Sequence, residues 1–312
     1  MNLKFWGVRG SLPSPASTVN LESKIQAIVS AITPNDLKDE ETRQAFILSL
    51  PSRLTSFVGG NTACVSIRIS KTEMIILDAG SGLRELSQNI SKEIKTFHIF
   101  LSHFHWDHIQ GIPFFAQIYQ NDCEIHFYSP VKNAEQTLSC QMSYPFFPVK
   151  FSDCASKISF HTLSVDKSFC VAGTYVRCHE ITHPNKAYSY LLNLENGKKI
   201  LYATDFEIGL KDFEETEENR AAFQDADIMI IDSQYTVQEF LEREHWGHPM
   251  FCYSIDFANH YRAKKVYLFH HDPAHDDKCL YDILEKARTY TKKILKSDMQ
   301  IFLAKEGIIE KL

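Results

Sequence analysis

The segment His103–His108, with the sequence HFHWDH, constrains this chain more than any other feature. It follows the apolar run Phe97–Phe100, and it places three imidazoles and a carboxylate, the preferred protein ligands of zinc-like ions, within six residues. A continuous strand would turn His108 away from the others. We therefore expect the chain to leave strand geometry after Ser102 and to wrap these side chains around one or two metal ions. A polar loop of solvated histidines is the less favoured alternative, because strand ends are where metal sites form.

Four ligands in one loop cannot complete two metal coordination spheres, so further ligands are expected at other strand ends. His183 follows a strand that ends at Ile181, Asp205 follows the apolar run 200–202, and His270 ends another apolar strand. Each has an alternative role, His183 as a loop histidine bound to a carbonyl group and Asp205 as the cap of a following helix. Strand alternation places His270 and His271 on opposite sides of their strand, so either could be the ligand.

The pattern His-x-His-x-Asp-His resembles the signature of the metallo-β-lactamase superfamily of hydrolases. Other stretches are similar to a bacterial subfamily described as cyclic-nucleotide-phosphodiesterase-like and related to ribonuclease Z. These stretches are Lys4–Ser11, Gly59–Thr62, Leu77–Gly80, Ser233–Thr236, Trp246–His248 and Leu268–Pro273. They keep the order of that subfamily, with one insertion at about residues 16–56. The resemblance implies an α/β fold in which residues 1–312 form one domain, a four-layer αββα sandwich with the site at one edge.

The resemblance also implies how two divalent ions would be held. It assigns His103, His105 and His183 to one ion, Asp107, His108 and His270 to the other, and Asp205 to both. It favours His270 over His271 as the ligand. Asp107 is also expected to be catalytic, and Asn61 and His271 are expected to contact the substrate. Zinc is the first expectation because nitrogen ligands dominate, with manganese or iron as alternatives.

His248 is expected to be catalytic without being a ligand. In relatives the stretch Trp-Gly-His continues with Ser and Thr, and its histidine stands beside the scissile phosphate as a proton donor. Here Trp246–His248 is kept, but Pro249 and Met250 follow. The imidazole can still transfer a proton near neutral pH. The missing hydroxyl groups remove phosphate contacts that the resemblance would otherwise imply.

The insertion predicts two helices. The second opens at Thr33-Pro34 and continues through Phe46. Packing on the outside of the core is the simpler interpretation, and a lid or a dimer contact is the alternative. Downstream we expect a helix at 109–119 and a single strand at 169–178. The first insertion helix carries an apolar stripe at helical spacing, formed by Leu21, Ile25, Ile28, Val29 and Ile32.

Composition narrows the choice of function. The net charge of −6 argues against general binding of long nucleic acids, which requires clustered Lys and Arg. The eight cysteines include no CxxC pair, so they indicate neither a zinc ribbon nor a redox dithiol. No signal peptide or membrane-spanning run is recognised, and a cytoplasmic location is the default expectation.

We therefore expect a binuclear metal-dependent hydrolase of phosphodiesters that acts on a small anionic substrate such as a cyclic nucleotide. A water shared by the two ions would attack phosphorus, and His248 would protonate the leaving alkoxide. Two alternatives remain at this stage. One is a metallohydrolase of carboxylic esters such as lactones or thioesters, and the other is a non-hydrolytic metal-binding regulator. Association as a homodimer is also considered.

Overall fold

The computed structural model describes all 312 residues. It contains two seven-stranded sheets with the same arrangement of parallel and antiparallel strand pairings. In each sheet the three strand pairings at one side are antiparallel and the three at the other side are parallel. The first sheet has the order β14 (Ile309–Lys311), β1 (Asn2–Gly7), β2 (Cys64–Arg68), β3 (Glu73–Leu77), β4 (Thr96–Phe100), β5 (Glu124–Ser129), β6 (Lys157–Thr162). The second has the order β13 (Gln300–Leu303), β12 (Lys265–Phe269), β11 (Ile228–Asp232), β10 (Lys199–Ala203), β9 (Ala187–Asn193), β8 (Thr174–Ile181), β7 (Ser168–Val171).

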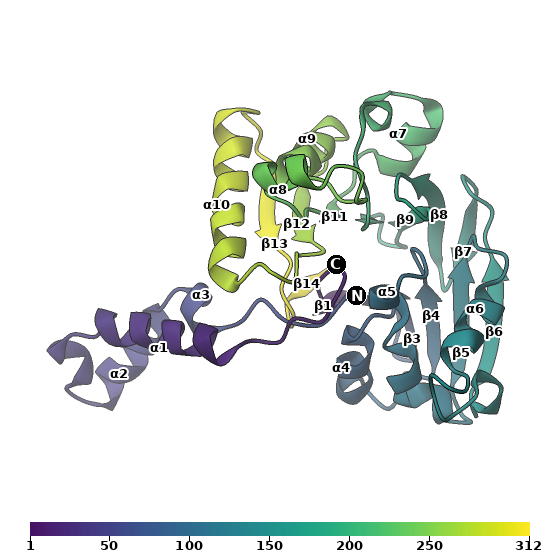
Figure 1. Cartoon of the computed structure of the whole chain (residues 1–312), viewed down its shortest axis with the longest axis horizontal. Coiled ribbons are helices and arrows are strands. Elements are labelled where there is room, and N and C mark those ends of the chain that lie inside the picture. The colour runs from purple at the N-terminus through teal and green to yellow at the C-terminus, as the bar shows by residue number, and fades with distance from the viewer.

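Helices cover the outer faces of this pair of sheets (Figure 1). Near the first sheet lie α4 (Gly82–Asn89), α5 (Trp106–Ile109) and α6 (Ala134–Gln141). Near the second lie α7 (Glu217–Phe223), α8 (Val237–Glu242), α9 (Phe251–His260) and α10 (Asp277–Lys293). The insertion contains α1 (Thr18–Ala31), α2 (Glu40–Ser49) and α3 (Ser52–Thr55). Five short 3-10 turns complete the chain, at Pro34–Leu37, Ile112–Phe114, Ala116–Tyr119, Phe151–Asp153 and Leu210–Phe213.

The buried apolar side chains form two cores, which is what a four-layer sandwich requires. One core fills the space between the sheets, where Phe100 meets Tyr190, and continues under α9 and α10. The other lies between the first sheet and its outer helices, around Leu86, Phe97 and Leu138. The predicted four-layer αββα architecture is therefore confirmed.

The central parallel strands are buried on both faces and therefore read as continuous apolar runs. All five residues of β11, for example, are buried. Polar residues follow where such strands end, and three of them, Asp78, Asp205 and His270, have φ values of 56°, 54° and 58°. This left-handed conformation turns the chain sharply out of the sheet and costs about 1–3 kcal/mol per residue. It leaves the three side chains at the same edge of the sandwich.

Two predicted elements are wrong in detail. The single strand expected at 169–178 is a hairpin of β7 and β8, because Ala172 and Gly173 both adopt positive φ and form a two-residue turn. The helix expected at 109–119 is not formed, because α5 ends at Ile109 and two 3-10 turns follow it. Gly111 and Pro113 interrupt the α-helical hydrogen bonds there.

The insertion projects from the body as an arm, Thr18–Ser49, which the short helix α3 joins to α10 (Figure 1). The second predicted helix begins later than expected. Pro34 starts only a 3-10 turn, and α2 begins at Glu40 after Asp39 accepts a hydrogen bond from the Thr42 amide at 2.8 Å. No helix in the structure combines the length and the hydropathy that crossing a bilayer requires.

Candidate metal centre

The Asp78 carboxylate holds the loop after β4 in place through hydrogen bonds. The backbone amide and the hydroxyl of Ser102 both donate to the Asp78 carboxylate at 2.7 Å. The Tyr202 hydroxyl donates to it at 2.8 Å, and Nδ1 of His108 lies 2.8 Å from the same carboxylate. Asp78 is completely buried, and these contacts compensate its desolvation. They also fix where the loop begins and how the His108 ring is turned.

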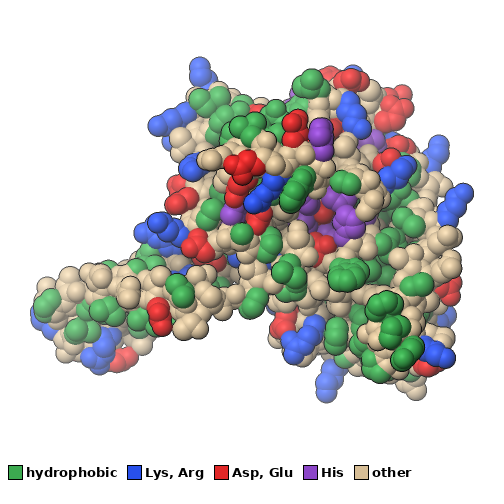
Figure 2. All heavy atoms as spheres, in the orientation of Figure 1, with side chains coloured by type: hydrophobic (Ala, Val, Ile, Leu, Met, Phe, Trp, Pro, Cys, Tyr) green, Lys and Arg blue, Asp and Glu red, His purple; other side chains and the backbone are tan.

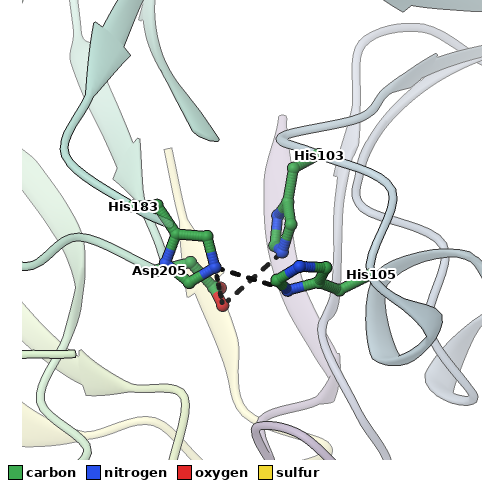
Figure 3. A group of neighbouring side chains, drawn as sticks. All are labelled: His103, His105, His183 and Asp205. Atoms are coloured by element: carbon green, nitrogen blue, oxygen red, sulfur yellow. Dashed lines mark hydrogen bonds and ion pairs between the residues drawn. The ribbon is translucent and has the colours of Figure 1, made fainter. Parts of the chain in front are cut away.

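Four strand-end side chains converge in what we call cluster A, formed by His103, His105, His183 and Asp205 (Figure 3). One donor atom from each lies within 4.8 Å of all the others. Nε2 of His183 is 3.3 Å from Nδ1 of His105, and Nε2 of His103 is 3.7 Å from Oδ1 of Asp205. Figure 3 shows His103 and His105 reaching in from one loop and His183 from the opposite side, with the three imidazoles facing the Asp205 carboxylate.

Cluster B lies next to it and is formed by Asp107, His108, His270 and the same Asp205. Nε2 of His270 is 3.2 Å from carboxylate oxygens of both Asp107 and Asp205. Nε2 of His108 is 3.0 Å from Asp107 and 3.1 Å from Asp205. All four residues are buried.

Asp205 connects the two clusters through its two oxygens. Its Oδ1 faces His103 and His183 of cluster A, whereas its Oδ2 faces His108 and His270 of cluster B. A carboxylate that offers one oxygen to each of two groups of imidazoles is the arrangement that a pair of neighbouring cations needs. The same side chain therefore belongs to both candidate binding positions.

The imidazoles are oriented through the nitrogen that does not face a cluster. His183 Nδ1 lies 3.1 Å from the Gly247 carbonyl oxygen, and His270 Nδ1 lies 2.9 Å from Oε1 of Gln234. On the outer side, His105 Nε2 lies 3.0 Å from the Asn185 amide nitrogen. The carbonyl oxygens beside His183 and His270 can each accept the outer N–H, and such partners fix the ring orientation and the tautomer of metal-binding histidines.

The residues present fit a divalent cation in each cluster. Nε2 of His103 is buried, points into cluster A and has no hydrogen-bond partner in the protein. A buried unpaired nitrogen is costly unless something binds it. The donor sets, three imidazoles with a carboxylate and two imidazoles with two carboxylates, suit zinc and related divalent ions.

Burial and nearby carboxylates shift the histidine pKa values in opposite directions in the two clusters. Desolvation lowers the pKa of His103, His105 and His183, which favours the neutral, metal-binding form of the ring. Burial alone would also lower the pKa of His270, but Asp205 and the other nearby carboxylates outweigh it and raise that pKa to about 9. Cluster B thus attracts positive charge strongly.

His248 stands beside both clusters without belonging to either. Its ring stacks on His270 with centroids 5.0 Å apart, and its Nδ1 lies 2.8 Å from Oδ2 of the fully buried Asp232. Gly247, just before it, has φ +92°, and a Cβ there would lie 2.4 Å from the His183 ring. Only glycine therefore lets this loop approach the cluster closely enough to place His248.

Two residues expected to contact substrate are placed elsewhere. His271 is buried, and its Nε2 bonds the Ala304 carbonyl oxygen at 2.9 Å on the side of the strand away from the clusters. Asn61 accepts a hydrogen bond from the Ser81 hydroxyl and donates to Glu306. Both side chains are used in holding loops, so the structure argues against direct substrate contact by either.

Three residues around the site were not singled out from the sequence. Asp232 orients His248, Gln234 orients His270, and Glu207 accepts hydrogen bonds from the backbone amides of His245 and Gly247 at 3.1 and 2.9 Å. Asp232 had a usable signal, because it ends the apolar run 228–231 just as Asp78 ends 74–77. Glu207 lies in a loop where no comparable pattern marks it, and Gln234 lies in the stretch Ser233–Thr236, which the family resemblance marks without indicating a role for its residues.

Comparison with known proteins agrees with this geometry. The family model described as the beta-lactamase superfamily domain matches residues 73–271, which is more than half of the chain. The chain therefore belongs to the beta-lactamase superfamily, and the predicted family is confirmed.

Individual relatives are more distant. A ribonuclease Z of Prochlorococcus marinus (strain MIT 9515) is 27% identical over 141 residues, which make up 42% of this chain and 43% of that protein. The metallo-β-lactamase fold protein YhfI from Bacillus subtilis superposes with a TM-score of 0.62 at 13% identity, covering 99% of this chain and 98% of that one. A diphosphatase from the PhnP family also reaches 0.62, at 16% identity, covering 100% and 97%. These two likenesses establish the fold alone.

Proposed function

We propose that the protein is a binuclear metal-dependent hydrolase of phosphodiester bonds. The observation that carries this proposal is the shared carboxylate of Asp205, with one oxygen facing each of two converging donor sets. Cluster A and cluster B would each hold one divalent ion, with zinc favoured by the five imidazoles. The partial similarity to a ribonuclease Z and the shared fold with a diphosphatase support phosphoryl chemistry.

Bound divalent ions at such a site activate water and neutralise charge on phosphoryl oxygens. The residues of the chain then have two tasks. The surrounding loops bury cluster B and most of cluster A, with His105 partly exposed, and so restrict access of bulk water. His248, next to both clusters but bound to neither, holds the proton that the leaving alkoxide needs. Asp232 accepts a hydrogen bond from Nδ1 of His248, which leaves Nε2 as the nitrogen available for proton transfer.

Exposed aromatic side chains adjacent in sequence to the candidate site residues favour a small substrate that carries a flat ring. Trp106 lies between two candidate ligands in the chain, and Trp246 adjoins the glycine whose carbonyl contacts His183; their surfaces are 82% and 64% exposed. Figure 2 shows hydrophobic side chains around the histidine-lined hollow. Bases stack on such rings with a gain of about 1–3 kcal/mol each. With a net charge of −6, a cyclic nucleotide fits better than a long polyanion.

Replacing His248 tests the proposed mechanism. His248→Ala should lower kcat on a cyclic nucleotide by about 10²–10⁴-fold. It should lower kcat on bis(p-nitrophenyl) phosphate far less, because p-nitrophenolate leaves without a proton. The metal content of the variant should remain at two ions per chain by mass spectrometry.

His161→Ala, at an exposed position on β6, serves as the matched control and should change neither rate. The same panel should contain a lactone and a thioester. Equal losses on both phosphodiesters, or full activity of His248→Ala on every substrate, would contradict a proton-donor role. Hydrolysis of the carboxylic esters alone would replace the phosphodiesterase assignment.

A further inference from the structure

The arm Thr18–Ser49 exposes an apolar surface that the rest of the chain leaves uncovered. Figure 2 shows hydrophobic side chains distributed over its surface. The arm lies outside the residues that match the superfamily domain. It also leaves the histidine-lined hollow open in Figure 2, so it does not act as a lid in this arrangement. Its exposed large aliphatic residues are Val19, Leu21, Ile25, Val29, Leu37, Ile47 and Leu48.

Helix α1 shows how the surface arises. Asn20, Lys24 and Ile28, spaced by four residues, form the edge of the helix that turns toward the body and is covered or partly covered. The neighbouring edge carries Leu21, Ile25 and Val29, which expose 47%, 50% and 61% of their surface. The apolar stripe is therefore wider than the contact that the body provides.

The arm is held in a fixed orientation at its base. Lys24, the only buried residue of α1, donates to the carboxylate of Asp277 at 2.6 Å and to the carbonyl oxygens of Arg53 and Ser56 at 2.7 Å. Lys305 also donates to the hydroxyl groups of Ser52 and Ser56. The exposed stripe is thus presented to solvent in a defined direction rather than on a loose tether.

The arm has too little internal packing to be stable in water by itself. Helix α2 has ten residues, and none of them is buried. Isolated helices shorter than about 12–15 residues are marginal in water, and most helical stability in proteins comes from a packed apolar face. The arm therefore needs a partner surface.

We infer that this partner is a second copy of the chain, bound arm to arm around α1. Leu21, Ile25 and Val29 form an exposed row spaced by four residues along α1, which is a ridge that can pack into the groove of a second copy of the helix. The only charge on α1 other than the paired Lys24 is Glu22, so two copies of this helix repel each other little.

The exposed apolar area of the arm can be compared with the area that a homodimer interface buries. At roughly 100 Å² of apolar surface for a fully exposed large aliphatic side chain, the seven residues supply on the order of 400 Å² per chain. A standard interface takes about 800 Å² from each partner, of which about 65% is apolar in homodimers. A contact that covered all seven residues would supply most of the apolar area that a standard homodimer interface takes from each chain.

Light scattering coupled to size exclusion tests the inference on the full-length protein. The wild type should have twice the 35.9 kDa mass of the chain at micromolar concentration. The double variant L21E/I25E should raise the dimer dissociation constant by at least about 100-fold. Leu210→Glu, which places the same charge on a residue exposed elsewhere, should leave the dimer intact. A monomeric wild type, or a dimer that L21E/I25E leaves unchanged, would overturn the inference.

Hydrogen exchange on the unmutated protein gives a second test that does not depend on the variant folding. Amides of residues 18–49 should exchange more slowly at high than at low protein concentration, because dimerisation covers the arm. Amides of β11, in the buried centre of the second sheet, should show no such dependence. Equal exchange of the arm at both concentrations would also count against a second copy as the partner.

Discussion

The molecule contains two groups of histidines, one at the strand ends and one within three neighbouring strands of the first sheet, and only the first has the donor geometry of a candidate metal site. At the strand ends, imidazoles alternate with buried carboxylates, and donor atoms from separate loops lie within 4.8 Å of one another. On β4, β5 and β6, by contrast, His98, His126 and His161 stack on one another without forming such a set.

The distances to carboxylates separate the two groups. In cluster B the contacts between imidazole nitrogens and carboxylates are 3.0–3.2 Å. In the group on β4, β5 and β6, which we call the strand stack, His98 is 3.8 Å from Glu73 and His126 is 3.7 Å from Glu124. Both glutamates are partly exposed. The number of histidines therefore does not define a metal site. What defines it is a buried carboxylate between them and a fixed partner for each outer nitrogen.

The strongest test of this comparison is Asp205→Asn. The substitution removes the only carboxylate shared by the two clusters, while asparagine keeps the left-handed backbone that Asp205 adopts. Metal content should fall below one ion per chain, and kcat should fall at least about 10³-fold, more than the loss of a single hydrogen-bond donor costs.

Metal analysis and steady-state kinetics measure both effects. His126→Ala, in the strand stack, is the matched control and should keep both ions and full activity. Retention of two ions by Asp205→Asn would show that the clusters bind independently, and the bridging assignment would then be wrong.

A smaller effect is expected from Asp232→Asn. This residue contacts no candidate ion directly but positions the His248 ring through Nδ1. The amide keeps the shape of the side chain and weakens the orientation of the imidazole, so kcat on a cyclic nucleotide should fall about 10–100-fold with metal content unchanged.

The pH profile distinguishes positioning from structural damage in this variant. The limb of the kcat profile that reports the protonated donor should move, whereas KM should stay within about twofold. An unchanged profile with a proportional loss at every pH would assign Asp232 a structural role only.

The smallest effect concerns the stability of the strand stack. Burial, and then the neighbouring His126 and His161, lowers the pKa of His98 to about 4 in the folded protein, against 6.5 for an ordinary histidine. Between these pH values the unfolded chain binds a proton that the folded chain does not, so stability falls as the pH falls from 6.5 toward 4. The groups facing His98 are Glu73, His126 and the Tyr128 hydroxyl.

His98→Gln should remove this dependence. Urea unfolding at pH 7 and pH 4.5 should show that the wild type loses about 2–3 kcal/mol more than the variant over this interval. Parallel losses in both proteins would mean that His98 is protonated in the folded state, contrary to its burial.

Much of the site could be predicted because its candidate ligands follow the ends of apolar strands. His183, Asp205 and His270 each follow an apolar strand, and parallel strands bring their carboxyl ends to one edge, so their convergence on the His103–His108 loop could be expected from the sequence. The four-layer architecture, in contrast, depended on family resemblance, because apolar runs alone do not specify how sheets stack.

What could not be predicted depends on tertiary contacts. Glu207 and Gln234 act through hydrogen bonds to groups far away in the chain; nothing in the local sequence marks Glu207, and the stretch around Gln234 is marked only by family resemblance. His271 differs from its neighbour His270 only in the side of the strand it faces, and the bond to Ala304 became visible only in the folded chain. The hairpin at Ala172-Gly173 was missed because a single glycine did not outweigh the apolar run around it.

The left-handed backbone at Asp78, Asp205 and His270 limits which residues evolution or design can place there. Aspartate, asparagine and histidine tolerate this conformation better than longer or branched side chains do. Replacing one of these aspartates by glutamate keeps the charge. It would nevertheless displace the carboxylate and destabilise the left-handed backbone. Variation in this protein should be easier to obtain in the loops that surround the strand ends than at the strand ends themselves.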